Sequence, residues 1–345
     1  MRPTTARLIR HPAPPGIDTL SRTTGKGLAA IPDPRHRAMV ASVLDAGLVE
    51  EAIADTADFD ATTVDQPRRT AHMARLTAEF EAFGVVVPAA TTRNITLMRA
   101  LMVPIEDPVV AYAVDRVWVF VTNVDDVCSK NVAEAEALLR AGMLPDARDL
   151  AASPYARYVA HMFRELAPHG DPTFLAAFKT LFYSALNGVL MEAEFDPEVS
   201  DEADGDYVRL FNGFSQFWFL SLQFTDPSLS AHRHRAFWTA AMSSCVGYLN
   251  DVNDVLSFYK EAVDGEDFAI SRIHRRAVQE GIPYLTAYRR SLADGRKAYD
   301  RVLRLATAEQ RPHLDRYMTA FAYWHLHCRR YRWQDVYPGL EMIDA

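Results

Sequence analysis

Three polar residues spaced four apart, Asn253, Ser257 and Glu261, have the types and spacing that point most directly to chemistry. On an α-helix they stack one turn apart within an arc of about 80°, so one face presents an amide oxygen, a hydroxyl and a carboxylate. These are hard oxygen ligands of the kind that Mg²⁺ takes, together with waters and substrate phosphates. Lys260 lies beside them, where it can meet an anion. The spacing predicts a metal-binding helix; the alternative is a solvated polar stripe.

Two adjacent acids, Asp125 and Asp126, end an aromatic and aliphatic segment that includes Trp118. Neighbouring carboxylates repel each other and are costly unless they are solvated or bridged by a cation. The pattern therefore predicts either a solvated helix end or an apolar wall with carboxylates at its rim.

A third group combines a cation with a helix breaker. Arg209 is followed by Asn212 and Gly213 within an apolar helical segment. A glycine there costs about 1 kcal/mol relative to alanine, so it usually has a packing or functional reason.

The last group lies near the C-terminus, in the pattern W-x₅-R-Y. Arg330 can donate bidentate hydrogen bonds to phosphate oxygens, and Tyr331 adds a phenol donor. Trp324 can present a π face to a cation. His325 and His327 are two residues apart and face apart on a helix, so they make a poor metal site.

The elements that must position these groups are helices. Apolar periodicity is helical nearly throughout from residue 36, without convincing strand alternation or a fixed-period repeat. We expect helices over 36–55, 67–83, 91–103, 107–130, 132–142, 150–167, 172–193, 205–223, 229–262, 268–280, 284–307 and 310–333, with breaks at glycine and proline. The predicted fold is all-α: residues 1–35 form an irregular arm, and residues 36–345 form one helical domain around a central cavity.

Composition limits the function. The chain has 345 residues, 49% of them hydrophobic and 24% charged, and a net charge of −8. A negative chain gives no electrostatic case for nucleic acid or an anionic membrane. Cys128, Cys245 and Cys328 form no C-x-x-C pattern, which argues against a disulfide framework and fits a reducing compartment. No apolar run of about 20 residues and no signal peptide are found, so we expect a cytoplasmic protein without a membrane span.

These groups together resemble a known family. The order N-D-x-x-S-x-x-K-E at 253–261 is similar to the second metal motif of class I terpene synthases. The sequence of this segment, NDVLSFYKE, is most similar to the trichodiene-synthase type of sesquiterpene cyclase. The other groups occur in the order typical of this family: the acid pair and Arg209 precede this motif, and the Arg330-Tyr331 pair follows it. In related enzymes an N-terminal strap often covers the active site.

The resemblance implies a class I terpenoid synthase helical bundle around an active-site cavity that binds three Mg²⁺ ions. Two would lie on the side of Asp125 and Asp126, and one at the triad of Asn253, Ser257 and Glu261. The family often has a further acid after the pair, but this chain has Ser129 at that position, with Asn131 as the nearest amide. Asp125 is then the expected direct ligand, and Asp126 orients an arginine or a water.

The resemblance also implies roles for the remaining residues. Arg209, Asn212 and Gly213 match a diphosphate sensor, a linker and an effector whose backbone carbonyl faces a developing allylic cation. Lys260 and the Arg330-Tyr331 pair would bind the diphosphate with Arg209. Bulky residues would line the cavity: Trp118, Val121, Phe211, Phe214 and Trp324.

The expected function is a Mg²⁺-dependent sesquiterpene synthase, a carbon–oxygen lyase. It would ionise farnesyl diphosphate and cyclise the carbocation to a hydrocarbon or alcohol, with release of diphosphate. Alternatives are a cyclase of geranyl or geranylgeranyl diphosphate, a chain-elongating prenyltransferase, which would carry a second aspartate-rich motif, and a non-catalytic helical scaffold. The expected partner is a small isoprenoid diphosphate, and a homodimer stays open.

Overall fold

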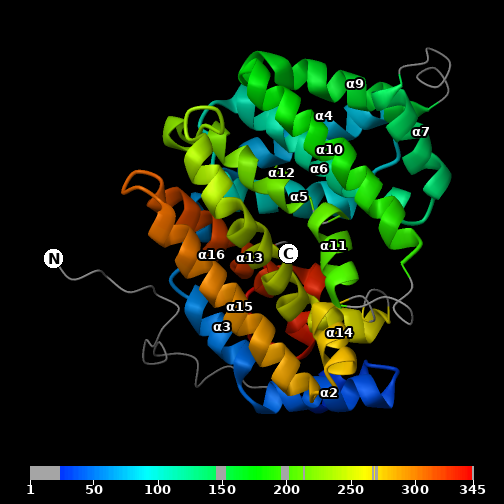
Figure 1. Ribbon diagram of the computed structural model, residues 1–345, viewed down its shortest axis with the longest axis vertical. Coiled ribbons are helices and arrows are strands. Elements are labelled where there is room, and N and C mark those ends of the chain that lie inside the picture. The colour runs from blue at the N-terminus through cyan, green and yellow to red at the C-terminus, as the bar shows by residue number, and fades with distance from the viewer. Residues whose placement is uncertain are drawn as a thin grey trace. The chain divides into compact units, whose positions relative to one another are not determined.

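The computed structural model describes residues 24–144, 153–195, 202–212, 214–265, 268 and 271–343. Every regular element in this part of the chain is helical (Figure 1). The predicted all-α fold is therefore confirmed. Gly213 and the side chain of Asn212 lie outside the described residues.

The α-helices follow the predicted segments closely. They are α1 (Thr24–Ala29), α2 (Pro34–Asp45), α3 (Leu48–Thr56), α4 (Gln66–Phe83), α5 (Ala89–Met102), α6 (Pro108–Cys128), α7 (Val132–Met143), α9 (Pro154–Leu166), α10 (Pro172–Ala193), α11 (Glu202–Asn212), α12 (Ser215–Leu220), α13 (Arg235–Asp264), α14 (Arg272–Gln279), α15 (Tyr284–Leu305) and α16 (Arg311–His327). Short 3₁₀ helices connect some of them: η2 (Ala61–Thr63), η3 (Ala167–His169), η4 (Ser221–Phe224), η5 (Pro227–Leu229), η6 (Arg329–Tyr331) and η7 (Trp333–Asp335).

Asp-Pro pairs start several of these helices. At α2, α6 and α10 the aspartate side chain accepts hydrogen bonds from backbone N–H groups of the first turn, and a proline follows at the first helical position. The carboxylate satisfies donors that the helix leaves open, and proline has no N–H to satisfy there. This local chemistry explains why the predicted and observed starts agree.

Two predicted helices are each divided into two by a left-handed residue. The segment 36–55 becomes α2 and α3 because Gly47 has φ 71°. The segment 205–223 becomes α11 and α12, with Phe214 at φ 49°. A left-handed residue cannot continue a right-handed helix, so the axis changes direction at both points.

The chain divides into two compact units. Unit 1 comprises Met1–Asp60, Ser243–Leu305 and Leu314–Ala345, and unit 2 comprises Ala61–Met242 and Ala306–His313. The long helix α13 begins in unit 2 and continues in unit 1.

In unit 2, α10 packs against α6, α7, α11 and α12, and α6 packs against α4, α5 and α9 (Figure 1). Stacked rings form part of this core, with the centroids of Phe178 and Phe217 3.7 Å apart. By length and composition α10 is apolar enough to cross a membrane. Its buried residues Phe174, Phe178 and Phe182 pack inside unit 2, as in the core helix of a globular protein.

A buried ionic network joins α4 to α6 and α9 within unit 2. Arg116 donates to both carboxylate oxygens of Glu79 at 2.6 and 2.9 Å. The hydroxyls of Tyr158 and Tyr112 donate to the same carboxylate at 2.7 and 2.9 Å. Burial alone would raise the pKa of Glu79, but these four hydrogen bonds lower it to about 2. The carboxylate is therefore a structural anion.

In unit 1, aromatic side chains donate hydrogen bonds that fix α13. Trp333 donates to the carbonyl of Leu256 at 2.8 Å. Other such donors are Tyr248, which bonds the carbonyl of Met318 at 2.6 Å, and Tyr288, which bonds the carbonyl of Val255 at 3.1 Å. The end of α13 that carries the predicted triad is thus held on several sides.

The described part of the predicted N-terminal arm is not irregular. Thr24–Ala29 is helical, and α2 begins at Pro34. The hydroxyl of Tyr259 on α13 donates to the carbonyl of Gly27 at 3.0 Å. Because this contact spans most of the sequence, local composition could not reveal it. Residues 1–23 lie outside the described part, so the predicted strap stays a prediction.

Candidate active site

Asn253, Ser257 and Glu261 lie on successive turns of α13 in unit 1. The Ser257 hydroxyl is within hydrogen-bond distance of Glu261 Oε1 at 2.5 Å and of the Asn253 carbonyl at 2.7 Å. Ser257 and Glu261 are buried, with 2% and 6% of their surface exposed, and Asn253 is half-buried. The helix therefore concentrates three oxygen-bearing side chains on one face, as the spacing predicts.

The Asn253 amide has a partner on α16. Its nitrogen donates to Nε2 of His325 at 3.2 Å, and the other ring nitrogen, Nδ1, donates to the Phe321 carbonyl at 2.8 Å. His325 is fully buried, and burial lowers its pKa to about 3. The ring is therefore neutral at physiological pH.

Two of the predicted C-terminal residues lie around the same histidine. The ring centroids of Tyr331 and His325 are 4.2 Å apart, and that of Trp324 is 5.2 Å from Tyr331 and 5.0 Å from His325. Burial is the main cause that raises the pKa of Tyr331, and the negative charge of Glu261 raises it further. The phenol therefore stays protonated and can act as a donor. The indole N–H of Trp324 is buried and has no hydrogen-bond partner among the described residues.

Arg330 and Tyr331 are not on the last helix, contrary to the prediction. α16 ends at His327, and the pair lies on the 3₁₀ turn η6. Arg332 follows with φ 64°, which ends the turn. Arg330 is exposed and Tyr331 is buried, so the turn directs two adjacent donors into different environments.

Asp125 and Asp126 lie in the last turn of α6 in unit 2, and both are half-buried. Glu261 has the same placement in the last turn of α13. A helix dipole is negative at its C-terminal end, where each acid costs about 0.3–1 kcal/mol. A bound cation would offset this cost at both places, because it neutralises the acids and the helix end together.

The residues that follow the acid pair Asp125-Asp126 have a structural role. Asn131 is the N-cap of α7, where its side-chain oxygen accepts the Glu134 N–H at 3.3 Å. Ser129 is exposed, and its N–H donates to the Asp125 carbonyl at 3.1 Å. The departure from the family's third acid therefore falls where the chain turns from α6 into α7.

Arg209 occupies the last turn of α11 and is half-buried. α11 ends at Asn212, and the left-handed Phe214 separates it from α12. Both α11 and α6 pack on α10, so the helices of Arg209 and of the acid pair share a neighbour. α11 therefore ends immediately before Gly213, and the predicted effector itself lies outside the described residues.

No protein-family model matches the chain. The alpha-cuprenene synthase COP6 of Coprinopsis cinerea is 26% identical over 238 residues, which are 65% of this chain and 69% of that protein. The linalool/nerolidol synthase of Streptomyces clavuligerus, solved with 2-fluorogeranyl diphosphate, matches with a TM-score of 0.56 and 16% identity, over 77% of this chain and 94% of that one.

The chain has the class I terpene synthase fold. The resemblance of the chain to class I terpene synthases is confirmed by a sequence relative and by a structural neighbour. The expected site residues are divided between the two units. Unit 1 brings together the triad, Trp324 and Tyr331; unit 2 holds the acid pair and Arg209.

The terpene synthase fold implies Mg²⁺, and the triad's donor set fits it. Amide, hydroxyl and carboxylate oxygens are its preferred ligands, and Ser257 and Glu261 already lie in contact. Lys260, which precedes Glu261 directly in the sequence, is half-buried. No cluster of three His, Cys, Asp or Glu side chains occurs in the described ranges, and the triad contains only one such residue.

Of the expected lining residues of unit 2, three are buried and Phe211 is half-buried. Trp118 is buried, its indole N–H donates to the Ser221 hydroxyl at 3.0 Å, and its ring centroid lies 4.6 Å from that of Trp218. Val121 and Phe214 are also buried. Their role as walls of a substrate cavity stays a prediction.

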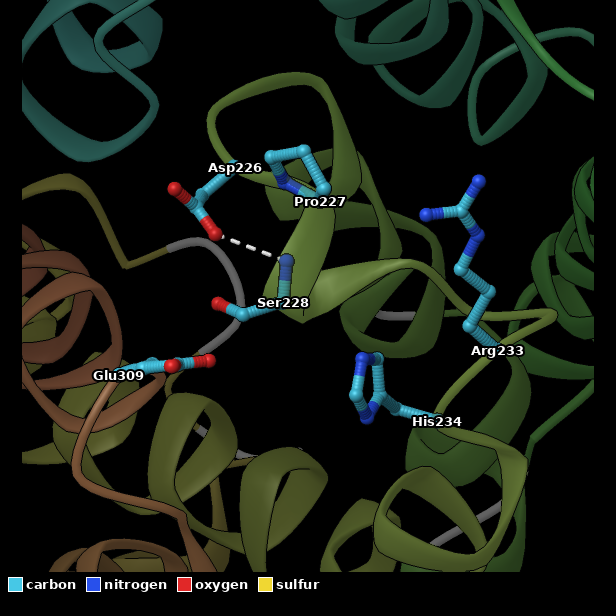
Figure 2. Close-up of a pocket in the computed structure, with 6 residues that line it drawn as sticks. All are labelled: Asp226, Pro227, Ser228, Arg233, His234 and Glu309. Carbon is cyan, nitrogen blue, oxygen red and sulfur yellow. Dashed lines mark hydrogen bonds between the residues drawn. The ribbon is translucent and has the colours of Figure 1, made fainter.

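An open pocket of about 600 Å³ in unit 2 contains none of the predicted site residues (Figure 2). Its walls carry mixed charge from Asp226, Glu309, Arg233 and His234. Figure 2 shows that Asp226 is already used to accept the Ser228 N–H, at 2.7 Å. This bond caps η5, so the carboxylate's role there is structural.

Sequence reasoning missed His325. Because His325 and His327 are two residues apart, the sequence indicated only that they could not share a metal ion. In the structure the two rings have different partners: His327 Nδ1 donates to the Glu341 carbonyl at 2.7 Å. The sequence holds one signal that could have found it: His325 follows Trp324 directly in the W-x₅-R-Y pattern.

Proposed function

We propose that this chain is a class I terpene cyclase, a carbon–oxygen lyase that ionises an isoprenoid diphosphate and cyclises the resulting carbocation. The observation that carries the proposal is the triad on α13, where Ser257 and Glu261 are in contact at 2.5 Å and Asn253 lies one turn away. The motif order and the fold support it independently.

The triad would hold one Mg²⁺ ion, and Asp125, with Asp126 beside it, would hold two more. When bound, Mg²⁺ supplies positive charge that neutralises the diphosphate as it leaves. The assignment of both groups to one reaction rests on the order of the motifs in the sequence. The positions of the acids at two helix C-termini support this assignment, because a negative charge at a helix C-terminus is stabilised by a nearby cation.

The chain's own donors would bind the leaving anion. Arg209 and Arg330 can each offer a planar fork to two phosphate oxygens, and Lys260 offers a compact charge. The Tyr331 phenol stays protonated because burial raises its pKa, so it remains a donor. Together they orient the substrate so that the carbon–oxygen bond breaks with the charge already compensated.

Ionisation leaves an allylic cation that must be kept from water, since early attack by water would trap it as an alcohol. The buried ring of Trp324 offers a π face to such a cation. The break at Asn212–Phe214 supports the proposed effector at Gly213, whose carbonyl would face the cation.

We propose farnesyl diphosphate as the substrate, because the sequence of residues 253–261 is most similar to the trichodiene-synthase type of sesquiterpene cyclase. A sequence relative is named alpha-cuprenene synthase. The bulky residues expected to line the cavity suit fifteen carbons better than twenty. Three free cysteines, all buried, suit a reducing compartment such as the cytoplasm.

Incubation of the purified chain with farnesyl diphosphate and Mg²⁺, followed by gas chromatography of the organic extract, tests this function. Cyclic fifteen-carbon products are expected. A longer linear diphosphate formed with isopentenyl diphosphate would indicate a chain-elongating prenyltransferase instead, and release of neither product would contradict the proposal.

Comparison of kcat/KM for the ten-, fifteen- and twenty-carbon diphosphates then tests the substrate. The highest value is expected for fifteen carbons. If the twenty-carbon substrate were cyclised best, the sesquiterpene assignment would fail, while the metal chemistry of the triad would stand.

A further inference from the structure

The hydrogen bonds around His325 fix the chemistry of its two ring nitrogens. The Phe321 carbonyl, 2.8 Å from Nδ1, can only accept, so Nδ1 must carry the proton. In the neutral ring Nε2 is then an acceptor. The Asn253 group that lies 3.2 Å from Nε2 must be the amide nitrogen, because the amide oxygen has no proton to donate.

These hydrogen bonds identify which end of the Asn253 amide is the oxygen. The two ends of an asparagine amide have nearly the same shape, and only hydrogen bonds distinguish them. With the nitrogen committed to His325, the oxygen is the end turned away from the ring. A flipped amide would present an N–H₂ group where a cation needs a lone pair.

The ring cannot readily adapt to a different arrangement. His325 has 0% of its surface exposed, which disfavours a charged ring. It packs between aromatic neighbours, with centroids 4.2 Å from Phe321 and 4.2 Å from Tyr331. Rotation would break these contacts and the bond to the Phe321 carbonyl together.

We propose that His325 is a positioning residue for the metal triad: it holds the amide nitrogen of Asn253 and so commits the amide oxygen to the metal. This inference rests on the proposed function and adds a residue from α16 behind a metal triad that is built on α13. Partners behind a metal ligand typically change metal affinity about 10–100-fold when they are lost.

Two substitutions separate this role from simple packing. His325→Gln can place a carbonyl oxygen where Nε2 lies and so retains the acceptor for Asn253. His325→Asn places its polar atoms where Nδ1 lies, which retains the tie to the Phe321 carbonyl and loses the acceptor. A role confined to fixing α16 would favour the asparagine variant, whereas the positioning role favours the glutamine variant.

The measurement is binding of inorganic diphosphate by calorimetry at increasing Mg²⁺ concentrations, which needs no turnover. The Mg²⁺ concentration at half-saturation is expected to rise about tenfold or more for His325→Asn and to stay within about threefold of wild type for His325→Gln. Circular dichroism and thermal unfolding, measured alongside, select conditions in which both variants are folded.

A double-mutant cycle adds an internal control. In the Asn253→Asp background both ends of the side chain are oxygens, so no end needs to be selected. His325→Asn should then add no further rise in the Mg²⁺ requirement, and the coupling between the two positions should account for the whole effect seen in the wild-type background.

Equal shifts for the two His325 variants, a wild-type Mg²⁺ requirement in a folded His325→Asn variant, or the same rise in both backgrounds would overturn the positioning role alone. A wild-type chain that binds no diphosphate at any Mg²⁺ concentration would overturn the proposed function, and the inference with it.

Discussion

The hydroxyl of Ser257 lies 2.5 Å from Glu261 Oε1 and 2.7 Å from the backbone carbonyl of Asn253, one turn away on each side. A hydroxyl carries one proton, so it donates to one of these acceptors at a time. When the proton points to the Asn253 carbonyl, lone pairs of Ser257 and of the Glu261 carboxylate face each other, an arrangement that a cation would stabilise. The hydroxyl can therefore change acceptor by rotating about its own bond, without backbone movement.

Glu261→Gln should lower kcat about 10²–10³-fold, the loss typical of one electrostatic group in an active site, while the fold survives. The substitution keeps the volume of the side chain and removes the charge that the metal requires. Steady-state kinetics at saturating Mg²⁺ measure the effect, with Glu136→Gln, at an exposed position on α7, as the matched control. A wild-type rate would remove Glu261 from the metal site.

Arg209→Lys should lower kcat about 10–100-fold and change the product mixture, because a point charge replaces a planar fork worth about 1.5–3 kcal/mol. Product analysis by gas chromatography and a rate measurement test both effects. Arg304→Lys, on an exposed stretch of α15, is the control. An unchanged rate with an unchanged product profile would show that Arg209 does not sense the diphosphate.

Gly27→Val should destabilise unit 1 by about 1–3 kcal/mol, the usual cost of overpacking. A Cβ atom at Gly27 would lie 2.9 Å from the Val336 side chain and 3.1 Å from the Asp335 carbonyl. Gly25→Val, on the same helix α1, is the control, because a Cβ there would meet nothing within 4 Å. Denaturant unfolding compares the two variants; equal stabilities would mean that α1 does not pack against the C-terminal turn.

Glu79→Gln should remove part of the chain's acid-dependent stability. The native pKa of Glu79, about 2, lies below the ordinary glutamate value of 4.5. Such a depressed pKa contributes stability that is present above pH 4.5 and is lost as the pH falls toward 2. For a partly exposed group this amounts to about 1–2 kcal/mol after allowance for solvent screening.

Unfolding measured from pH 7 to pH 2.5 tests this prediction. The wild-type chain should lose more stability across that range than the Glu79→Gln variant, although the variant is the less stable of the two at pH 7. Parallel curves for both proteins would contradict the role of Glu79 as a structural anion.

The sequence by itself determined the helices and the oxygen-bearing face of α13. Asp-Pro starts and glycine or proline breaks act within one turn, so the bounds of α6 and α10 could be predicted from neighbouring residues. The triad follows from the same local rule, since residues four apart share a helical face wherever the helix lies. The likeness to a family supplied the roles of Arg209 and the acid pair, which spacing alone left open.

Only the tertiary structure decided what surrounds that face. The bond from Asn253 to His325 joins α13 to α16, and the bond from Tyr259 to Gly27 joins α13 to the first described helix. The turn that carries Arg330 and Tyr331 is likewise set by packing, because Trp333 is anchored to the Leu256 carbonyl. Helical periodicity repeats every 3.6 residues and contains no information on which distant segment packs on a face. That choice depends on how the whole core fills space, so it appeared only when the chain was folded.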